Sequence, residues 1–164
     1  MPEARANNSR GRSRQRGTVM IEFMIVAPIL LLLLMAISEF GHALYQYNTL
    51  TKSVRDGARY LSKNATDSTD NIEIFATDVT QTINLVVYGN TGGGGSPKVP
   101  GLTTSHVTAS CMGGGLTCPG VEHIEVTAQW PYQSIIGASL PRFGFGADLP
   151  LGFTLRTSAT MRAM

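Results

Sequence analysis

With 164 residues, the chain has room for one compact domain with appendages, which excludes a protein with several large cores. Its formal net charge of +2 is unevenly distributed. Residues 1–17 contain five arginines and one glutamate, about +4, so the remainder carries about −2. A basic arm can bind the phosphates of nucleic acid, but this arm runs directly into an apolar segment, and no nucleic-acid partner is expected.

The apolar segment comprises residues 18–37 and contains one charged residue, Glu22. A helix of roughly 20 apolar residues crosses the hydrocarbon core of a bilayer. Arginines beside such a span stay on the cytoplasmic side, so the N-terminus is expected inside and the chain after Ser38 outside. The run is longer than that of an ordinary secretory signal, and no A-x-A-like site follows it, which favours a retained span.

Helical spacing continues beyond the span. The predicted helix extends from Thr18 to about Lys63, close to 70 Å at 1.5 Å per residue. Pro28 is expected to kink this helix rather than end it. Its predicted packing stripe, at alternating steps of four and three, comprises Phe40, Leu44, Tyr47, Thr51, Val54, Ala58 and Leu61.

A polar break at residues 64–69 precedes a second predicted helix. Asp70 and Glu73 suggest its capping signal, and Gly89 its end. One face of this helix would carry Ile72, Phe75, Val79, Ile83 and Val86. Residues 91–97, with four consecutive glycines, predict a flexible linker.

The period then changes to two, which is typical of half-buried strands. Residues 124–130 and 154–162 alternate between apolar and polar side chains, the second with Leu155, Thr157, Ala159 and Met161 inward. Residues 106–111 predict a weaker third strand. The expected fold is α+β: a basic leader (1–17), a transmembrane helix (18–38), an amphipathic extension (39–64) and a small exported domain with an antiparallel sheet (65–164).

Glu22 is the unusual residue of the span. An ionised carboxylate costs roughly 2.5 to 3.5 kcal/mol at the centre of a bilayer helix and less toward its ends, so a compensating partner is expected. The alternative is that Glu22, near the start of the helix, reaches the cytoplasmic interface.

The pattern G-x-x-x-x-E-[FY], here Gly17 to Phe23 after a basic arm, resembles the cleavage site of type IV prepilins. The resemblance is more specific to the TadE-like family of the tight-adherence system. It continues through residues 28–32, 39–41, 50–51 and 54–60, and more loosely in 126–132 and 157–162. Residues 65–120 show no such resemblance.

This resemblance implies a minor pilin or pseudopilin that an aspartic prepilin peptidase processes between Gly17 and Thr18. Glu22, followed by Phe23, would meet the new N-terminus of a neighbouring subunit and set the register of helices in the filament core. Other pilins, minor pilins and the inner-membrane assembly platform are the expected partners. Neither enzymatic activity nor a cofactor is implied, and the glycine runs contain no phosphate-binding G-x-x-x-x-G-K-[ST] motif.

Cys111 and Cys118 bracket a glycine-rich loop in the part placed outside the cytoplasm, where a local disulfide can form. A zinc site that adds His106 and His123 is the alternative, but the cysteine spacing is too wide for a zinc knuckle, and no metal site is expected. The apolar segment after Trp130 either folds back over the core or forms a patch for a neighbouring pilin.

On the outer helix, Arg55, Asp56 and Arg59 are either solvated charges or contacts for a partner. Gly57 marks either the close approach of another helix or a tolerated defect.

Two functions remain open at this point. The first is a cleaved, pilin-like structural subunit. The alternative is an uncleaved single-span envelope protein whose outer domain binds a partner or ligand.

Overall fold

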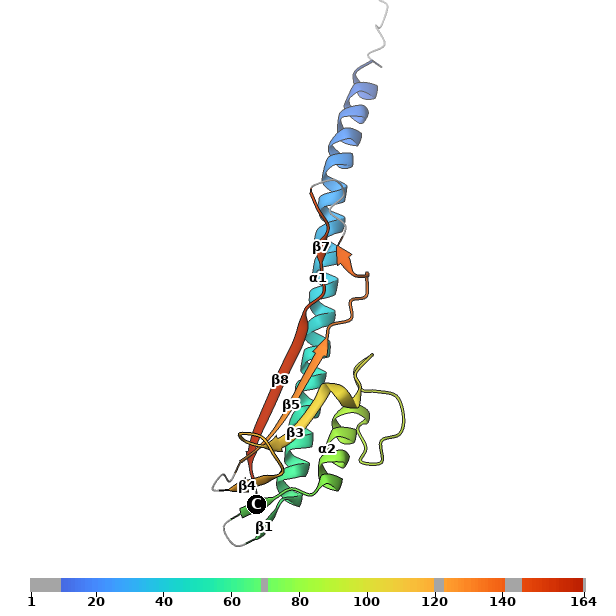
Figure 1. Cartoon of the computed structure of the whole chain (residues 1–164). Helices are drawn as coiled ribbons and strands as arrows, with labels where there is room; N and C mark the ends of the chain where they lie inside the picture. Colours follow the sequence, from blue (N-terminus) through green and yellow to red (C-terminus); the bar gives the residue numbers. More distant parts are fainter. Residues whose placement is uncertain (1–9, 69–70, 120–122, 141–145, 164) are drawn as a thin grey trace, which may run out of the picture.

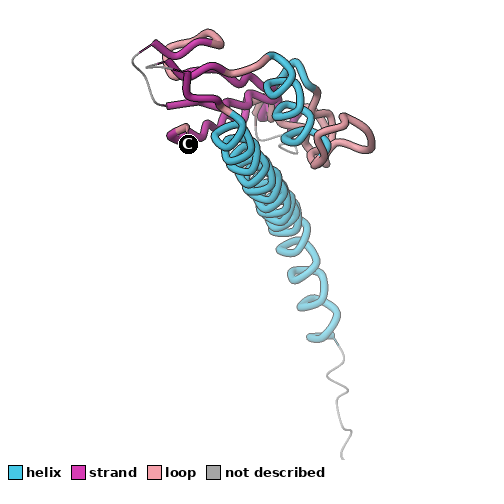
Figure 2. The backbone as a smooth tube through the Cα atoms, turned by 90° about the horizontal axis from the view of Figure 1, so that it is seen from below, coloured by secondary structure: helices cyan, strands magenta, loops and turns pink. Residues whose placement is uncertain are grey.

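A computed structural model describes residues 10–68, 71–119, 123–140 and 146–163. Its dominant element is one helix, α1 (Arg10–Asn64), of 55 residues, about 80 Å long at 1.5 Å per residue. The helix starts eight residues before the predicted start at Thr18 and continues through Pro28. Figures 1 and 2 show its N-terminal end projecting beyond the other elements, with the main sheet and the second helix gathered around its C-terminal half.

The main sheet is antiparallel, with strand order β3-β5-β8. Its strands are β3 (Val107–Cys111), β5 (His123–Pro131) and β8 (Thr154–Arg162), which confirms the three strands expected from the two-residue period. Alternate residues of β5 are fully buried: Ile124, Val126, Ala128 and Trp130. α1 contacts β5 and β8, and α2 contacts β3, so the two helices cover one face of the sheet. The predicted α+β class is correct.

The second helix, α2 (Ala76–Tyr88), starts later than predicted. Asn71–Glu73 forms a strand, β2, instead of the first helical turn, while Asp70 lies outside the described residues. β2 pairs with β1 (Thr66–Ser68) and with β4 (Thr117–Pro119). Pairing with a segment more than 40 residues away leaves no local signal in the sequence.

The predicted face of α2 is correct only toward its end. Ile72 belongs to β2, and Phe75 is the N-cap residue with 54% of its surface exposed. Val79 and Ile83 are half-buried and pack against the core, and Val86 is fully buried. Gly89 ends the helix as predicted: its φ of 81° is the left-handed conformation, and its N–H donates to Leu85 O (3.0 Å).

The remaining described elements are short. The linker 91–97 contains no helix or strand. A single 3-10 turn, η1 (Thr104–His106), precedes β3. Between β5 and β8 the chain makes a small hairpin from β6 (Ser139–Leu140) and β7 (Leu149–Pro150). Figure 1 shows this hairpin beside α1, on the side of the sheet that leads toward the helix N-terminus.

Gly57 lies at a close contact between α1 and α2. A Cβ atom at this position would lie 2.5 Å from Val86 Cγ2 and 3.4 Å from Thr82 Cγ2. Val86 and Thr82 are fully buried, and a β-branched side chain in a helix has little rotamer freedom. The first of the two interpretations of Gly57 is therefore correct: the glycine permits a close helix–helix contact.

Gly57→Val should destabilise the domain by about 2 kcal/mol or more, because overpacking forces the side chains and backbone around Val86 to move. Denaturant unfolding of the detergent-solubilised protein, followed through the single buried Trp130, measures the effect. Gly41→Val is the matched control, since Gly41 lies in the same helix with no atom within 4 Å of its Cβ position. Equal stability of the two variants would contradict the close contact.

Candidate functional site

The residues predicted for processing lie on the exposed N-terminal half of α1. Gly17, Thr18, Glu22 and Phe23 are all helical and exposed. Thr18 and Glu22 are four residues apart, which places their side chains on one face about 6 Å apart along the axis. A Cβ atom at Gly17 would meet no atom within 4 Å. Both the peptide bond after Gly17 and the Glu22 carboxylate are therefore open to partners from outside the chain.

The apolar residues around Glu22 have no partner inside the domain. Fourteen large apolar side chains between Val19 and Phe40 are each 42–66% exposed, and they lie on all sides of the helix. They include Val19, Phe23, Leu30, Leu34 and Ile37. By length and composition α1 is sufficient to cross a membrane, as a signal sequence near the N-terminus also is. A helix that is apolar all round is buried by something, and lipid is the common case. This half of α1 has the character of a membrane anchor.

The predicted packing stripe is only partly used within the chain. Val54, Ala58 and Leu61 are fully buried against the domain, whereas Phe40, Leu44 and Tyr47 are 66%, 45% and 39% exposed. Phe40, Leu44 and Tyr47 therefore do not pack into the core of this chain. The buried face is formed there by other residues: Glu39, Gln46, Leu50 and Ser53. Contacts of Phe40, Leu44 and Tyr47 with another subunit stay a prediction.

Glu39 is the first buried residue of α1 beyond the apolar span, with 4% of its surface exposed. Its carboxylate accepts a hydrogen bond from the Tyr132 hydroxyl and another from the backbone N–H of Ile136 (2.7 Å). The Tyr132 hydroxyl also contacts Glu39 O (3.2 Å). Because an unpaired buried carboxylate is costly, these two donors hold the segment after β5 against the helix.

Aromatic and polar side chains extend this contact. Tyr132 stacks on Phe153, with ring centroids 4.6 Å apart, and meets His42 edge-on at 6.2 Å. Burial raises the pKa of the Tyr132 phenol well above its ordinary value, and the hydrogen bond to Glu39 and the charge of that carboxylate raise it further. His42 Nε2 and Gln46 Nε2 are 2.7 Å apart, one turn further along α1.

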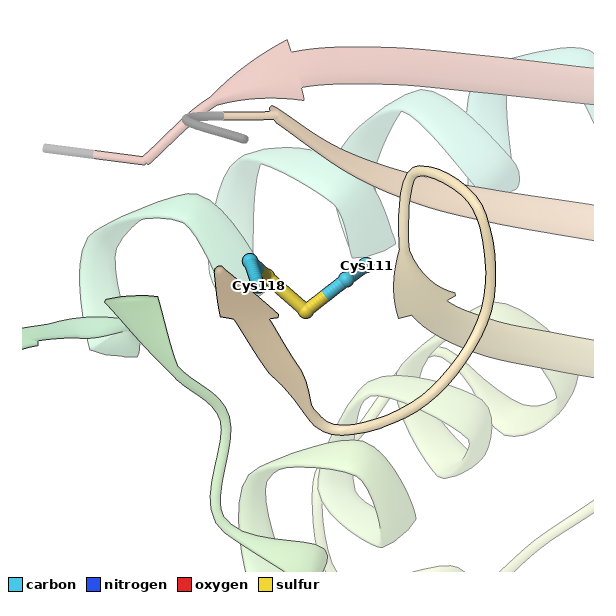
Figure 3. Close-up of a disulfide and its surroundings, with 2 residues drawn as sticks. All are labelled: Cys111 and Cys118. Atoms are coloured by element: carbon cyan, nitrogen blue, oxygen red, sulfur yellow. A yellow bond between two sulfur atoms is a disulfide. The ribbon is translucent and has the colours of Figure 1, made fainter. Parts of the chain in front are cut away.

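Cys111 and Cys118 form a disulfide in the structure, with Cα atoms 5.4 Å apart (Figure 3). Both residues are buried, and the bond joins the end of β3 to β4, connecting the two three-stranded sheets. His106 does not approach them but accepts a hydrogen bond from the Thr103 N–H through Nδ1 (3.1 Å). Among the described residues, no three or more His, Cys, Asp or Glu side chains are grouped as metal ligands.

Comparison with known proteins adds one finding to this geometry. The family model described as TadE-like protein matches residues 17–59. This segment of the chain is TadE-like. The match confirms the resemblance predicted from the motifs, and it covers 43 of the 164 residues. No curated protein and no solved structure matches the chain.

The TadE-like segment begins at Gly17 and ends at Arg59, inside the buried half of α1. A segment of this kind suggests a component of a tight-adherence (Tad) pilus. Glu39 lies within the TadE-like segment, while its two donors come from the part of the chain outside it. In the sequence, Glu39 and Tyr132 stand out only as parts of the motifs. The signal that could have predicted the hydrogen bonds of Glu39 is the position of a carboxylate directly after an apolar span.

Tyr132→Phe should lower the free energy of unfolding by about 1 to 3 kcal/mol, because the buried Glu39 carboxylate loses a donor. The loss should be constant below about pH 10, the ordinary pKa of tyrosine. Above it, the unfolded wild-type chain releases the Tyr132 proton that the folded state retains, so wild-type stability falls and the difference between the proteins shrinks.

Unfolding curves at several pH values between about 8 and 11, followed by Trp130 fluorescence, measure this difference. The other tyrosines titrate alike in both proteins and cancel. A difference that does not change with pH would show that the folded state does not raise the pKa of Tyr132.

Proposed function

We propose that the chain is a minor pilin or pseudopilin, a structural component of tight-adherence (Flp-type) pilus biogenesis that a prepilin peptidase cuts after Gly17. The observation that carries the proposal is Glu22, a carboxylate on an exposed apolar helix one turn from Thr18, in a TadE-like segment whose match begins at Gly17. Cleavage would put an ammonium at Thr18 on the side of the helix that carries the carboxylate.

The charges suggest how the chain is placed. Five arginines within residues 1–17 favour a cytoplasmic N-terminus, with α1 crossing the inner membrane and the sheet domain outside. The peptidase would then meet Gly17 at the cytoplasmic surface. The disulfide between Cys111 and Cys118 fits a domain that folds outside the cytoplasm.

Assembly would use the half of α1 that the domain leaves uncovered. In this proposal the Glu22 carboxylate pairs with the Thr18 ammonium of a neighbouring subunit, while Phe23, Phe40, Leu44 and Tyr47 supply apolar contacts along the helix. Two charges that are each costly in lipid compensate each other only when the subunits are in register. Other pilins, minor pilins and the assembly platform are the proposed partners.

Gly17→Val should block processing, because a branched side chain next to the cut peptide bond obstructs the peptidase, while the fold stays unchanged because no atom lies within 4 Å of the Cβ position. Intact-mass analysis of the membrane fraction should find wild type without residues 1–17 and the variant at full length. Gly41→Val, equally open around its Cβ position, should be processed normally. Full-length wild type in cells with a working peptidase would favour the alternative, an uncleaved envelope protein that binds a partner.

A further inference from the structure

The β6–β7 hairpin departs from the domain at a defined point on α1. Its stem is held by the Ile136 N–H on Glu39 Oε1 (2.7 Å) and by the Tyr132 N–H on Phe153 O (2.9 Å). From there the hairpin runs beside α1 toward the helix N-terminus, away from the main sheet (Figure 1). β6 contacts α1.

The stem lies at the outer end of the apolar run. That run, residues 18–37, is about the length needed to cross the hydrocarbon core. Glu39 follows two residues later. A hairpin that starts at Glu39 and runs beside α1 toward its N-terminus therefore lies level with the outer turns of the apolar run, where the membrane that α1 would cross has its outer boundary.

Three large apolar side chains of the hairpin and its stem are exposed. Ile135 is 63% exposed, and Leu149 and Phe153 are 45% exposed each. The whole segment 131–153 contains two charged residues, Arg142 and Asp148. Folding back over the core, one of the two expectations for this segment, does not account for these three exposed side chains.

We propose that this hairpin lies in the outer headgroup region of the lipid bilayer, beside the outer turns of the apolar run, and contacts lipid through Ile135, Leu149 and Phe153. The proposal rests on the membrane anchoring proposed above. Lipid is favoured over a protein partner because the exposed hairpin residues continue the exposed apolar surface of α1. In the proposed anchoring, lipid surrounds that surface of α1. Because β6 and β7 are only two residues long each, most backbone N–H and C=O groups of the hairpin are not paired in a sheet. Such groups need water, so the hairpin is expected in the hydrated interface and not in the hydrocarbon core.

Fluorescence quenching by nitroxide-labelled lipids tests this placement. The full-length protein is placed in phosphatidylethanolamine–phosphatidylglycerol vesicles that contain these lipids. Ile135→Cys and Leu149→Cys, labelled with an environment-sensitive dye, report on the hairpin. Phe75→Cys, 54% exposed at the start of α2, is the matched control, and Leu34→Cys, 61% exposed in the apolar run, is the positive control. The native cysteines are paired and do not take up the dye.

Lipids with a nitroxide close to the headgroup should quench the labels at 135 and 149 by about half, as expected for side chains at the headgroup boundary, and should leave the label at 75 almost unchanged. If the label at 34 is quenched but those at 135 and 149 are not, the hairpin is in water or covered by protein, and the proposal is wrong while the anchor stands. If the label at 34 also fails to respond to nitroxides at any depth, the membrane anchor itself is wrong, and this proposal with it.

Discussion

One continuous helix has an exposed apolar half and a half that packs against the domain, and the rest of the structure depends on where the two halves meet. Between Val19 and Ile37, α1 exposes apolar side chains in all directions, and from Glu39 onward it buries one face every three or four residues. Because no loop separates the two halves, the boundary between them depends on the contacts that the domain makes along the helix. Glu39, held by Tyr132 and Ile136, is the contact nearest to the change-over.

The packing of the C-terminal half explains why α1 can serve as part of a small core. Leu50, Val54, Ala58 and Leu61 are fully buried and stand one turn or less apart. Gly57 removes the side chain that would hold α2 away, and the disulfide joins the two sheets at the far end of the domain. The domain thus stabilises only the half of the helix that it covers and leaves the apolar side chains of the other half exposed.

The fold could be predicted from the sequence where the signal was local. The alternation in β5 and β8 and the glycine that ends α2 were sufficient, because each depends on neighbouring residues. β1, β2 and β4 could not be predicted, since strands of three residues have no measurable period and depend on pairing between distant segments. The apolar spacing could not show that Phe40, Leu44 and Tyr47 lie outside the core of the domain, because spacing alone does not distinguish that core from lipid or another subunit. Glu39 was missed as a buried residue because carboxylates are rarely buried without a partner, and its partners come from nearly 100 residues later.

The central claim of this account is that the Glu22 carboxylate is needed to pair with the amine exposed at Thr18. Counting surface pili in cells that carry Glu22→Ala tests it most directly, with a strain lacking the protein as the lower limit and Asp56→Ala, an exposed acid on the same helix, as the matched control. The account predicts that Glu22→Ala is still cleaved after Gly17 but yields as few pili as the strain without the protein, while Asp56→Ala is normal. Normal piliation by cleaved Glu22→Ala would contradict it.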